Sequence, residues 1–130
     1  DQCGNFTIGD QHFLVLKNEH KNWDHARKKC EEKGLDLAEP KDYKAVVNYL
    51  DENCENDNEW WLGGKGDGSN VVTISGTALD NNDPMWLRAD GSRTWDFHEA
   101  SRCLYLQAHD KNKPIYTHYC QLMHKIPLCG

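Results

Sequence analysis

The segment Trp23-Asp24-His25-Ala26-Arg27-Lys28-Lys29-Cys30 is the part of this chain whose structure is most clearly indicated by its residues. Its tryptophan, alanine and cysteine lie three and four positions apart, the spacing that puts side chains on one face of an α-helix. Asn22 is placed to cap the helix, Asp24 favours the first turn, and Gly34 is placed to end the helix. The segment therefore predicts a helix with one face made of Trp, Ala and Cys.

A second helix and a series of short strands are predicted around this segment. The second helix ends before Cys54, and its apolar face consists of four residues at helical spacing, Tyr43, Val46, Val47 and Leu50. Short apolar runs between polar or glycine-rich pieces predict strands at 12–16, 60–62, 71–74, 103–106, 115–119 and 126–129. Because the helices come early and most strands late, we expect an α+β fold with antiparallel sheets. A chain of 130 residues has the length of one domain, so residues 1–130 are predicted to form one.

The charge balance excludes two classes of partner. Fifteen basic residues stand against 21 acidic residues, and the net charge of -6 should repel both phosphate backbones and anionic lipid. No apolar run approaches the ~18 residues that a membrane span requires. The N-terminal Asp-Gln-Cys-Gly lacks the basic start and apolar stretch of a signal peptide. We therefore expect a soluble mature chain that binds no nucleic acid and does not insert into membranes.

The cysteines indicate a secreted protein. Six are present, and because no two form a Cys-x-x-Cys pair, zinc ribbons and thioredoxin-like redox sites are disfavoured. An even number of cysteines in a small domain is typical of secreted proteins, where disulfides supplement the core. The triplet Asn5-Phe6-Thr7 is an N-glycosylation signal, which agrees with an extracellular location and predicts a glycan on Asn5.

Taken together and in this order, the motifs resemble the C-type lectin-like domain over nearly the whole chain. Residues 23–30, with the following Gly34 and Leu37-Ala38, resemble the first helix of that family and the turn after it. Three further matches are Trp61-Leu62-Gly63 to the family's Trp-Ile-Gly strand, residues 86–92 to its Trp-x-Trp-x-Asp-Gly-Ser segment, and Cys103, Cys120 and Cys129 to its last three cysteines. The resemblance implies the C-type lectin-like fold, with two helices and antiparallel sheets joined by disulfides.

The resemblance also implies which cysteines pair. It implies a disulfide between Cys30 and Cys129, which joins the first helix to the final strand, and one between Cys103 and Cys120. Cys3 departs from the family pattern, because an N-terminal cysteine usually pairs about ten residues downstream and none stands between Cys3 and Cys30. By elimination Cys3 pairs with Cys54. Alternatively, one or both of these cysteines bridge to a partner chain.

Sugar binding in this family uses calcium, and here the pattern breaks. The family holds the ion with Glu-Pro-Asn or Gln-Pro-Asp in a long loop and with a later Trp-Asn-Asp. Residues 93–102 are short for that loop and contain neither tripeptide, and Ile115, Tyr116 and Thr117 stand at the Trp-Asn-Asp positions. Calcium takes about six to eight oxygen ligands, and these three side chains cannot take the place of the amide and carboxylate ligands of the family. This departure from the family pattern predicts that the calcium-sugar site is absent, and no cofactor is expected.

Other candidate metal ligands have simpler interpretations. Residues 65–85 form an expanded segment, in which Asp80, Asn82 and Asp83 could bind a divalent ion, although such clusters are more often solvated turns. His98-Glu99 is half of a zinc-hydrolase motif, but Arg102 stands where the second histidine is needed. His118, Cys120 and His124 could bind a metal only if Cys120 were reduced. We therefore expect no metal site.

The remaining candidate is an aromatic residue in the shortened loop. Trp95 lies near Asp96, His98 and Glu99, and an aromatic face beside carboxylates could stack a sugar or anchor a protein; a packed loop anchor is an equal alternative. Trp23, Trp61 and Trp86 match buried positions of the family, whereas Trp60 and Trp95 are less constrained. No nucleophile elbow, phosphate loop or acidic pair indicates an enzyme.

The sequence thus predicts a secreted, non-enzymatic recognition module that binds a glycan or a protein. The resemblance implies a role in adhesion or innate defence, by analogy only. The alternative is a structural or interaction subunit that works as a dimer with another chain.

Overall fold

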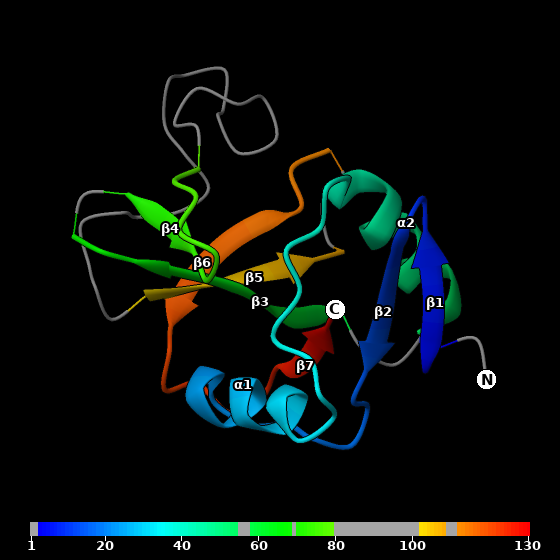
Figure 1. Ribbon diagram of the computed structural model, residues 1–130, viewed down its shortest axis with the longest axis horizontal. Helices are drawn as coiled ribbons and strands as arrows, with labels where there is room; N and C mark the ends of the chain where they lie inside the picture. Colours follow the sequence, from blue (N-terminus) through cyan, green and yellow to red (C-terminus); the bar gives the residue numbers. More distant parts are fainter. Residues whose placement is uncertain (1–2, 55–57, 69, 80–101, 109–111) are drawn as a thin grey trace.

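The structure is a computed structural model that describes residues 3–54, 58–68, 70–79, 102–108 and 112–130. The described elements are β1 (Asn5–Ile8), β2 (Gln11–Val15), α1 (Trp23–Glu31), α2 (Tyr43–Asn53), β3 (Glu59–Gly66), β4 (Val71–Thr73), β5 (Arg102–Gln107), β6 (Ile115–Tyr119) and β7 (Ile126–Cys129) (Figure 1). Both helices and all six strands predicted from the sequence are present, and β1 is an addition. Neither α1 nor α2 has the length and apolar character that crossing a bilayer requires.

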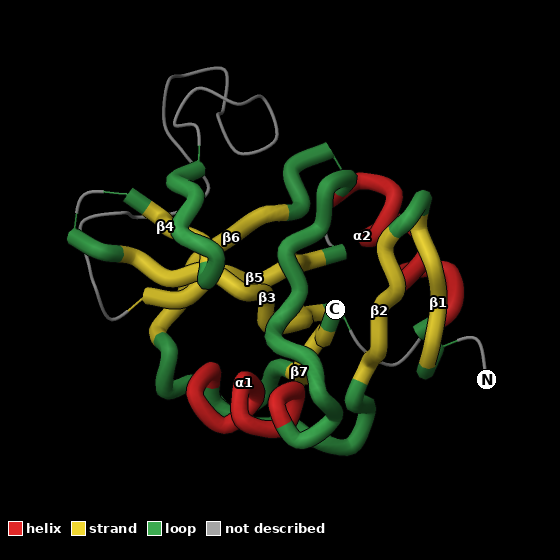
Figure 2. Tube along the Cα trace, viewed as in Figure 1, coloured by secondary structure: helices red, strands yellow, loops and turns green. Residues whose placement is uncertain are grey.

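The strands form a mixed sheet in which the expected antiparallel pairing has one parallel exception. Their order is β1-β2-β7-β3-β5-β6, with β4 paired to β3 (Figure 2). Within the described ranges every strand pair is antiparallel except β3 with β7, where Trp60 and Trp61 lie opposite Ile126 and Pro127. A parallel pair needs a long connection between its strands, and here β5 and β6 supply it. The antiparallel pairing expected from the sequence is confirmed for the other described pairs, and the parallel exception joins two strands that are far apart in sequence.

α1 begins at the predicted cap, α2 begins at a cap that was not predicted, and both helices bury residues of their predicted apolar faces. The Asn22 side chain accepts a hydrogen bond of 2.9 Å from the backbone N–H of His25 at the start of α1, and Asp42 caps α2 in the same way. The buried residues are Trp23, Ala26 and Cys30 in α1, and Val46, Val47 and Leu50 in α2. Capping satisfies backbone donors that a helix leaves open, so both helices have defined starts.

Each face of the sheet carries its own apolar cluster. On β3, Trp60 and Leu62 belong to the cluster beneath α2, whereas Trp61 belongs to the cluster beneath α1. Trp60 is 0% exposed, so the interpretation of this residue as less constrained was wrong. Because neighbouring side chains of a strand point to opposite faces, one of two neighbouring residues is often exposed to solvent. Both faces of β3 are covered, and Trp60 and Trp61 are therefore both buried.

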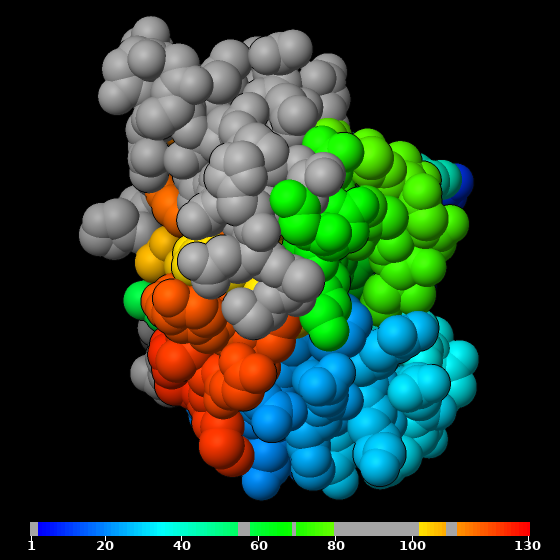
Figure 3. All heavy atoms as spheres, turned by 90° about the vertical axis from the view of Figure 1, so that its left-hand side faces the viewer, coloured from blue at the N-terminus to red at the C-terminus, as the bar shows by residue number. Residues whose placement is uncertain are grey.

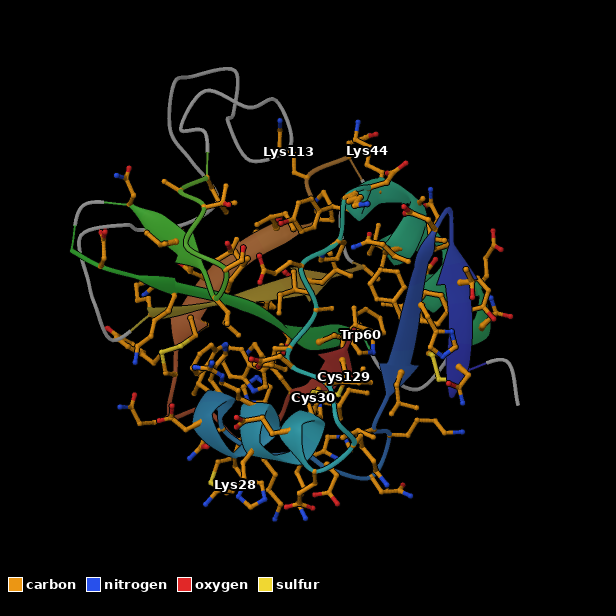
Figure 4. All side chains as sticks on the ribbon, in the orientation of Figure 1. Lys28, Cys30, Lys44, Trp60, Lys113 and Cys129 are labelled. Carbon is orange, nitrogen blue, oxygen red and sulfur yellow. A yellow bond between two sulfur atoms is a disulfide. The ribbon has the colours of Figure 1, made fainter. Side chains whose placement is uncertain are left out.

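The three disulfides use all six cysteines of the sequence within the chain. Cys30 is bonded to Cys129, Cys103 to Cys120, and Cys3 to Cys54, and these are the pairs expected from the sequence. Figure 4 shows Cys30 and Cys129 side by side between α1 and β7. The alternative in which Cys3 or Cys54 bridges to a partner chain does not hold, because each is already bonded to the other.

Gly63 explains how β3 can lie close to the segment after α1. Its backbone N–H donates to the carbonyl of Ala38 at 2.8 Å, and a Cβ at this position would lie 2.6 Å from the carbonyl oxygen of Leu37. Any side chain would therefore push the two backbones apart. The glycine of the Trp-Leu-Gly motif is required by this close approach.

Candidate functional site

The ligand residues predicted from the sequence lie outside the described residues. This applies to Trp95, Asp96, His98 and Glu99, to the metal candidates Asp80, Asn82 and Asp83, and to Trp86. Among the residues that the structure describes, no group of three His, Cys, Asp or Glu side chains is placed to hold a metal ion. The described part of the candidate site consists of β5, β6 and the turn that leads to β7.

The side chains at the Trp-Asn-Asp positions are used inside the fold. Ile115 is 0% exposed in the cluster beneath α2, and Tyr116 stacks on Tyr105 with ring centroids 5.9 Å apart. The Thr117 hydroxyl accepts a hydrogen bond of 3.2 Å from Arg102 Nε, and the Thr117 carbonyl accepts one of 2.8 Å from the same guanidinium. None of the three supplies a carboxylate or amide oxygen, the groups with which this family holds calcium.

A buried cation lies on the α1 side of the sheet. Lys125 is 0% exposed, and its ammonium lies 4.4 Å from the ring centroid of Tyr105 and 5.1 Å from that of Trp61. The same nitrogen lies 3.5 Å from Glu59 Oε1 and 3.1 Å from His124 Nε2. A buried charge is costly unless it is paired, and here aromatic faces and a carboxylate surround it.

Burial and charge shift the pKa values of this cluster. Burial lowers the pKa of Lys125, and the Glu59 carboxylate opposes that shift. Burial also raises the pKa of the Tyr105 phenol, and Glu59 adds to the effect. The phenol therefore stays protonated, and the Glu59 carboxylate lies 3.5 Å from the Lys125 ammonium and 3.1 Å from the His124 ring nitrogen. This cluster stabilises the start of β7 rather than offering a reactive group.

His118 on β6 predicts that the stability of the domain depends on pH. Burial lowers the pKa of His118, and the positive charges of Lys125 and Arg102 lower it further. The unfolded chain therefore takes up this proton first, at about pH 6.5, so stability that is full above this pH is lost as the pH falls toward the folded pKa.

We accordingly expect the free energy of unfolding to fall on acidification, and to fall less in His118→Gln. The measurement is urea denaturation of both proteins at neutral pH and about two units lower. His25→Gln on α1 is the matched control for the loss of an imidazole. Equal losses in the wild type and His118→Gln would show that His118 does not carry the effect.

Two large apolar side chains are exposed at the end of β6. Tyr119 is 44% exposed and Met123 is 57% exposed, and the Arg102 guanidinium lies 5.3 Å from the Tyr119 ring centroid. Figure 3 shows residues of β6 and the following turn, in orange to red, on the face beside α1 in blue. This surface was not predicted from the sequence, because apolar residue types by themselves predict burial.

A pocket of about 370 Å³ lies between the end of β2 and the last turn of α1. Its charged lining is partly paired internally, since Lys29 lies 4.0 Å from Glu19 and 3.7 Å from Glu32. These pairs leave little net charge to select an ionic ligand. The pocket is a weaker candidate than the surface at the end of β6.

Comparison with solved structures identifies the fold, whereas no protein-family model and no curated protein matches the chain. TC14, a C-type lectin from the tunicate Polyandrocarpa misakiensis, superposes with a TM-score of 0.65 at 19% identity over 90% of this chain and 94% of TC14. SPL-1 in complex with GlcNAc gives 0.71 at 16% identity over 98% and 92% of the two chains. A calcium-independent type II antifreeze protein gives 0.65 at 21% identity over 97% and 89%.

TC14 is described as a C-type lectin, SPL-1 as a GlcNAc complex and the third structure as an antifreeze protein, and none of the three is described as an enzyme. Their superpositions cover nine tenths or more of this chain. The fold expected from Trp23-x-x-Ala26-x-x-x-Cys30, Trp61-Leu62-Gly63 and the last three cysteines is therefore confirmed: this chain has the C-type lectin-like fold.

Proposed function

We propose that this chain is an extracellular recognition module that binds a glycan or a protein without the calcium site of its fold family. The observation that carries the proposal is that the three residues at the Trp-Asn-Asp positions have roles inside the fold. Ile115 is buried in the core, Tyr116 stacks on another ring, and Thr117 accepts a hydrogen bond from Arg102. Three disulfides support an oxidising compartment. Among similar structures, SPL-1 is described as a GlcNAc complex and the antifreeze protein as calcium-independent.

The proposed contact residues are Trp95, Asp96, His98 and Glu99. An indole offers an apolar face against which a sugar ring or an apolar protein side chain can stack. The neighbouring carboxylates and imidazole supply hydrogen-bonding groups for hydroxyls or amides. Such a site recognises its ligand by stacking and direct hydrogen bonds, and it needs no metal.

We expect ligand binding on a glycan array to be the same in millimolar calcium and in chelator. Trp95→Ala should weaken binding by about tenfold or more, because removing a central aromatic anchor costs about 2 kcal/mol. Lys28→Ala is the matched control, since Figure 4 shows Lys28 on the side of α1 that points away from the sheet. Equal binding by Trp95→Ala and Lys28→Ala would show that the shortened loop is not part of the binding site.

The same two conditions are also compared in a melting scan. A saturated calcium site would stabilise the fold by about 2.7 kcal/mol at a hundredfold excess over Kd, and we expect no such shift in Tm. A shift that disappears in an Asp80→Ala, Asp83→Ala double variant would instead place a metal site in residues 65–85. A shift in Tm that persists in that variant would instead favour the ordinary calcium-dependent site of the family.

We propose as the second candidate an interaction subunit that forms a non-covalent dimer. Its support is the exposure of Tyr119 and Met123, since exposed apolar side chains are typical of protein contacts. Light scattering after size exclusion separates the candidates. A mass near 15.0 kDa that does not rise with concentration favours the recognition module, whereas a doubled mass that Met123→Asp abolishes favours the dimer.

A further inference from the structure

The glycosylation signal lies on an exposed strand whose alternation turns both of its key residues outward. Asn5 and Thr7 on β1 are exposed, whereas Phe6 between them is 6% exposed. The Phe6 ring stacks on Tyr49 and Phe13, with centroids 4.2 and 5.2 Å away. Because neighbouring side chains of a strand point to opposite faces, the anchoring of Phe6 in the core fixes Asn5 and Thr7 outside it.

A histidine on the next strand holds the Asn5 side chain by its oxygen. His12 Nε2 lies 2.9 Å from Asn5 Oδ1, and His12 Nδ1 lies 3.4 Å from the Thr7 hydroxyl. In the tautomer with the proton on Nε2, His12 donates to Asn5 and accepts from Thr7, so one ring satisfies both contacts. The described residues make no hydrogen bond to Asn5 Nδ2, the atom to which a sugar would be attached.

The strand that carries the signal is the edge of the sheet. Among the described strands β1 pairs only with β2, and Figures 1 and 2 show it as the outermost strand of the sheet, with α2 behind it. The strand Asn5–Ile8 carries no lysine, proline or charged residue of the kind that protects an edge. No described strand pairs with the outer backbone N–H and C=O groups of β1.

We propose that Asn5 carries an N-linked glycan and that this glycan shields the edge of β1 from pairing with other chains. The proposal rests on the extracellular location given under the proposed function, but not on any ligand. A branched, strongly hydrated oligosaccharide at Nδ2 would project from the exposed face of β1. It would occupy the space that an added strand needs. The glycan would thus prevent edge-to-edge pairing, as lysine or proline does on the edge strands of other proteins.

The covalent step is the transfer of an oligosaccharide from a polyprenyl-diphosphate carrier. The bond between the sugar C1 and the diphosphate oxygen breaks, and its electron pair leaves with the diphosphate. A C1–N bond forms at Asn5 Nδ2, and the proton lost from this nitrogen goes to a base of the transferase. No oxidant or reductant is needed. The role of Thr7 in the Asn-x-Thr signal is to be recognised by the transferase.

The site is tested by secreting the chain from a eukaryotic host and treating it with a peptide N-glycosidase. The wild type and Thr7→Ser should both shift in gel mobility, whereas Asn5→Gln and Thr7→Ala should not. Secreted wild-type protein that does not shift would overturn the assignment. This result is independent of the glycan array. A chain that is glycosylated but binds no ligand on the array would therefore contradict only the proposed function.

The shielding role is tested with variants that all lack the glycan. Asn5→Gln should form aggregates on concentration that the glycosylated wild type does not form, as measured by light scattering. Thr7→Lys also destroys the signal but places a charge on the edge, and it should stay monodisperse. Equal behaviour of Asn5→Gln and the glycosylated wild type would overturn the shielding role. Aggregation of Thr7→Lys equal to that of Asn5→Gln would show that the edge is not the contact.

Discussion

Replacing Cys30 and Cys129 together by alanine is expected to lower the free energy of unfolding by about 5 kcal/mol. The two residues are 99 positions apart, and a cross-link over a longer loop removes more conformational entropy from the unfolded chain. Both cysteines are 0% exposed, so the loss of sulfur packing adds to the effect. The measurement is guanidinium denaturation of the double variant without reductant, with the other two disulfides intact.

The other two disulfides supply the internal comparison. Cys3–Cys54 spans 51 positions and Cys103–Cys120 spans 17, so their removal should cost about 4 and about 3 kcal/mol respectively. The order of the three losses is the prediction. If the double variant at Cys103 and Cys120 were the least stable, constraint of the unfolded chain would not be the main contribution of these cross-links.

Glu59→Gln is expected to destabilise the fold by about 3 kcal/mol, because it leaves the Lys125 ammonium buried without its carboxylate. Glu59 Oε1 lies 3.5 Å from that nitrogen, and the Lys125 side chain is 0% exposed. Lys125→Met keeps much of the volume and removes the charge, so its stability should lie within about 1 kcal/mol of the wild type. Thermal and denaturant unfolding of both variants measures the difference.

The double variant Glu59→Gln, Lys125→Met separates charge pairing from packing. With the cation gone, the loss of the carboxylate should cost little, and the double variant should resemble Lys125→Met. The expected coupling between the two sites is therefore large. Additive losses in the double variant would show that Glu59 acts through Gln107 or His124 instead, whose side chains lie 3.5 and 3.1 Å from its carboxylate.

The helices could be predicted from sequence because their signals are local. Asn22 and the spacing of Trp23, Ala26 and Cys30 define α1 without reference to the rest of the chain. The strands of the β5–β6 hairpin were predicted for the same reason, since short apolar runs between turns are local signals. The pairs Cys30–Cys129 and Cys103–Cys120 came from the resemblance to a known family, because spacing alone does not choose among many possible pairings, and Cys3–Cys54 followed by elimination.

The features that sequence did not predict depend on contacts between distant segments. Trp60 is buried only because helices cover both faces of β3, and Lys125 is buried only because β3 and β5 bring Trp61, Tyr105 and Glu59 around it. The parallel pairing of β3 with β7 joins residues more than 60 positions apart. A lysine in an isolated sequence predicts an exposed side chain, so the cluster around Lys125 could not be anticipated.

The position of β7 determines when this protein can fold as it leaves the ribosome. β7 is the last of the described strands in sequence, yet it lies between β2 and β3 in the sheet. Until residues 126–129 emerge from the exit tunnel, β2 and β3 have no strand between them, and the Cys30 thiol has no native partner. Closure of the sheet therefore has to wait until all of its other described strands have been made. During this interval Cys30 is open to mispairing with Cys3 or Cys54, which predicts that efficient production depends on a thiol–disulfide isomerase.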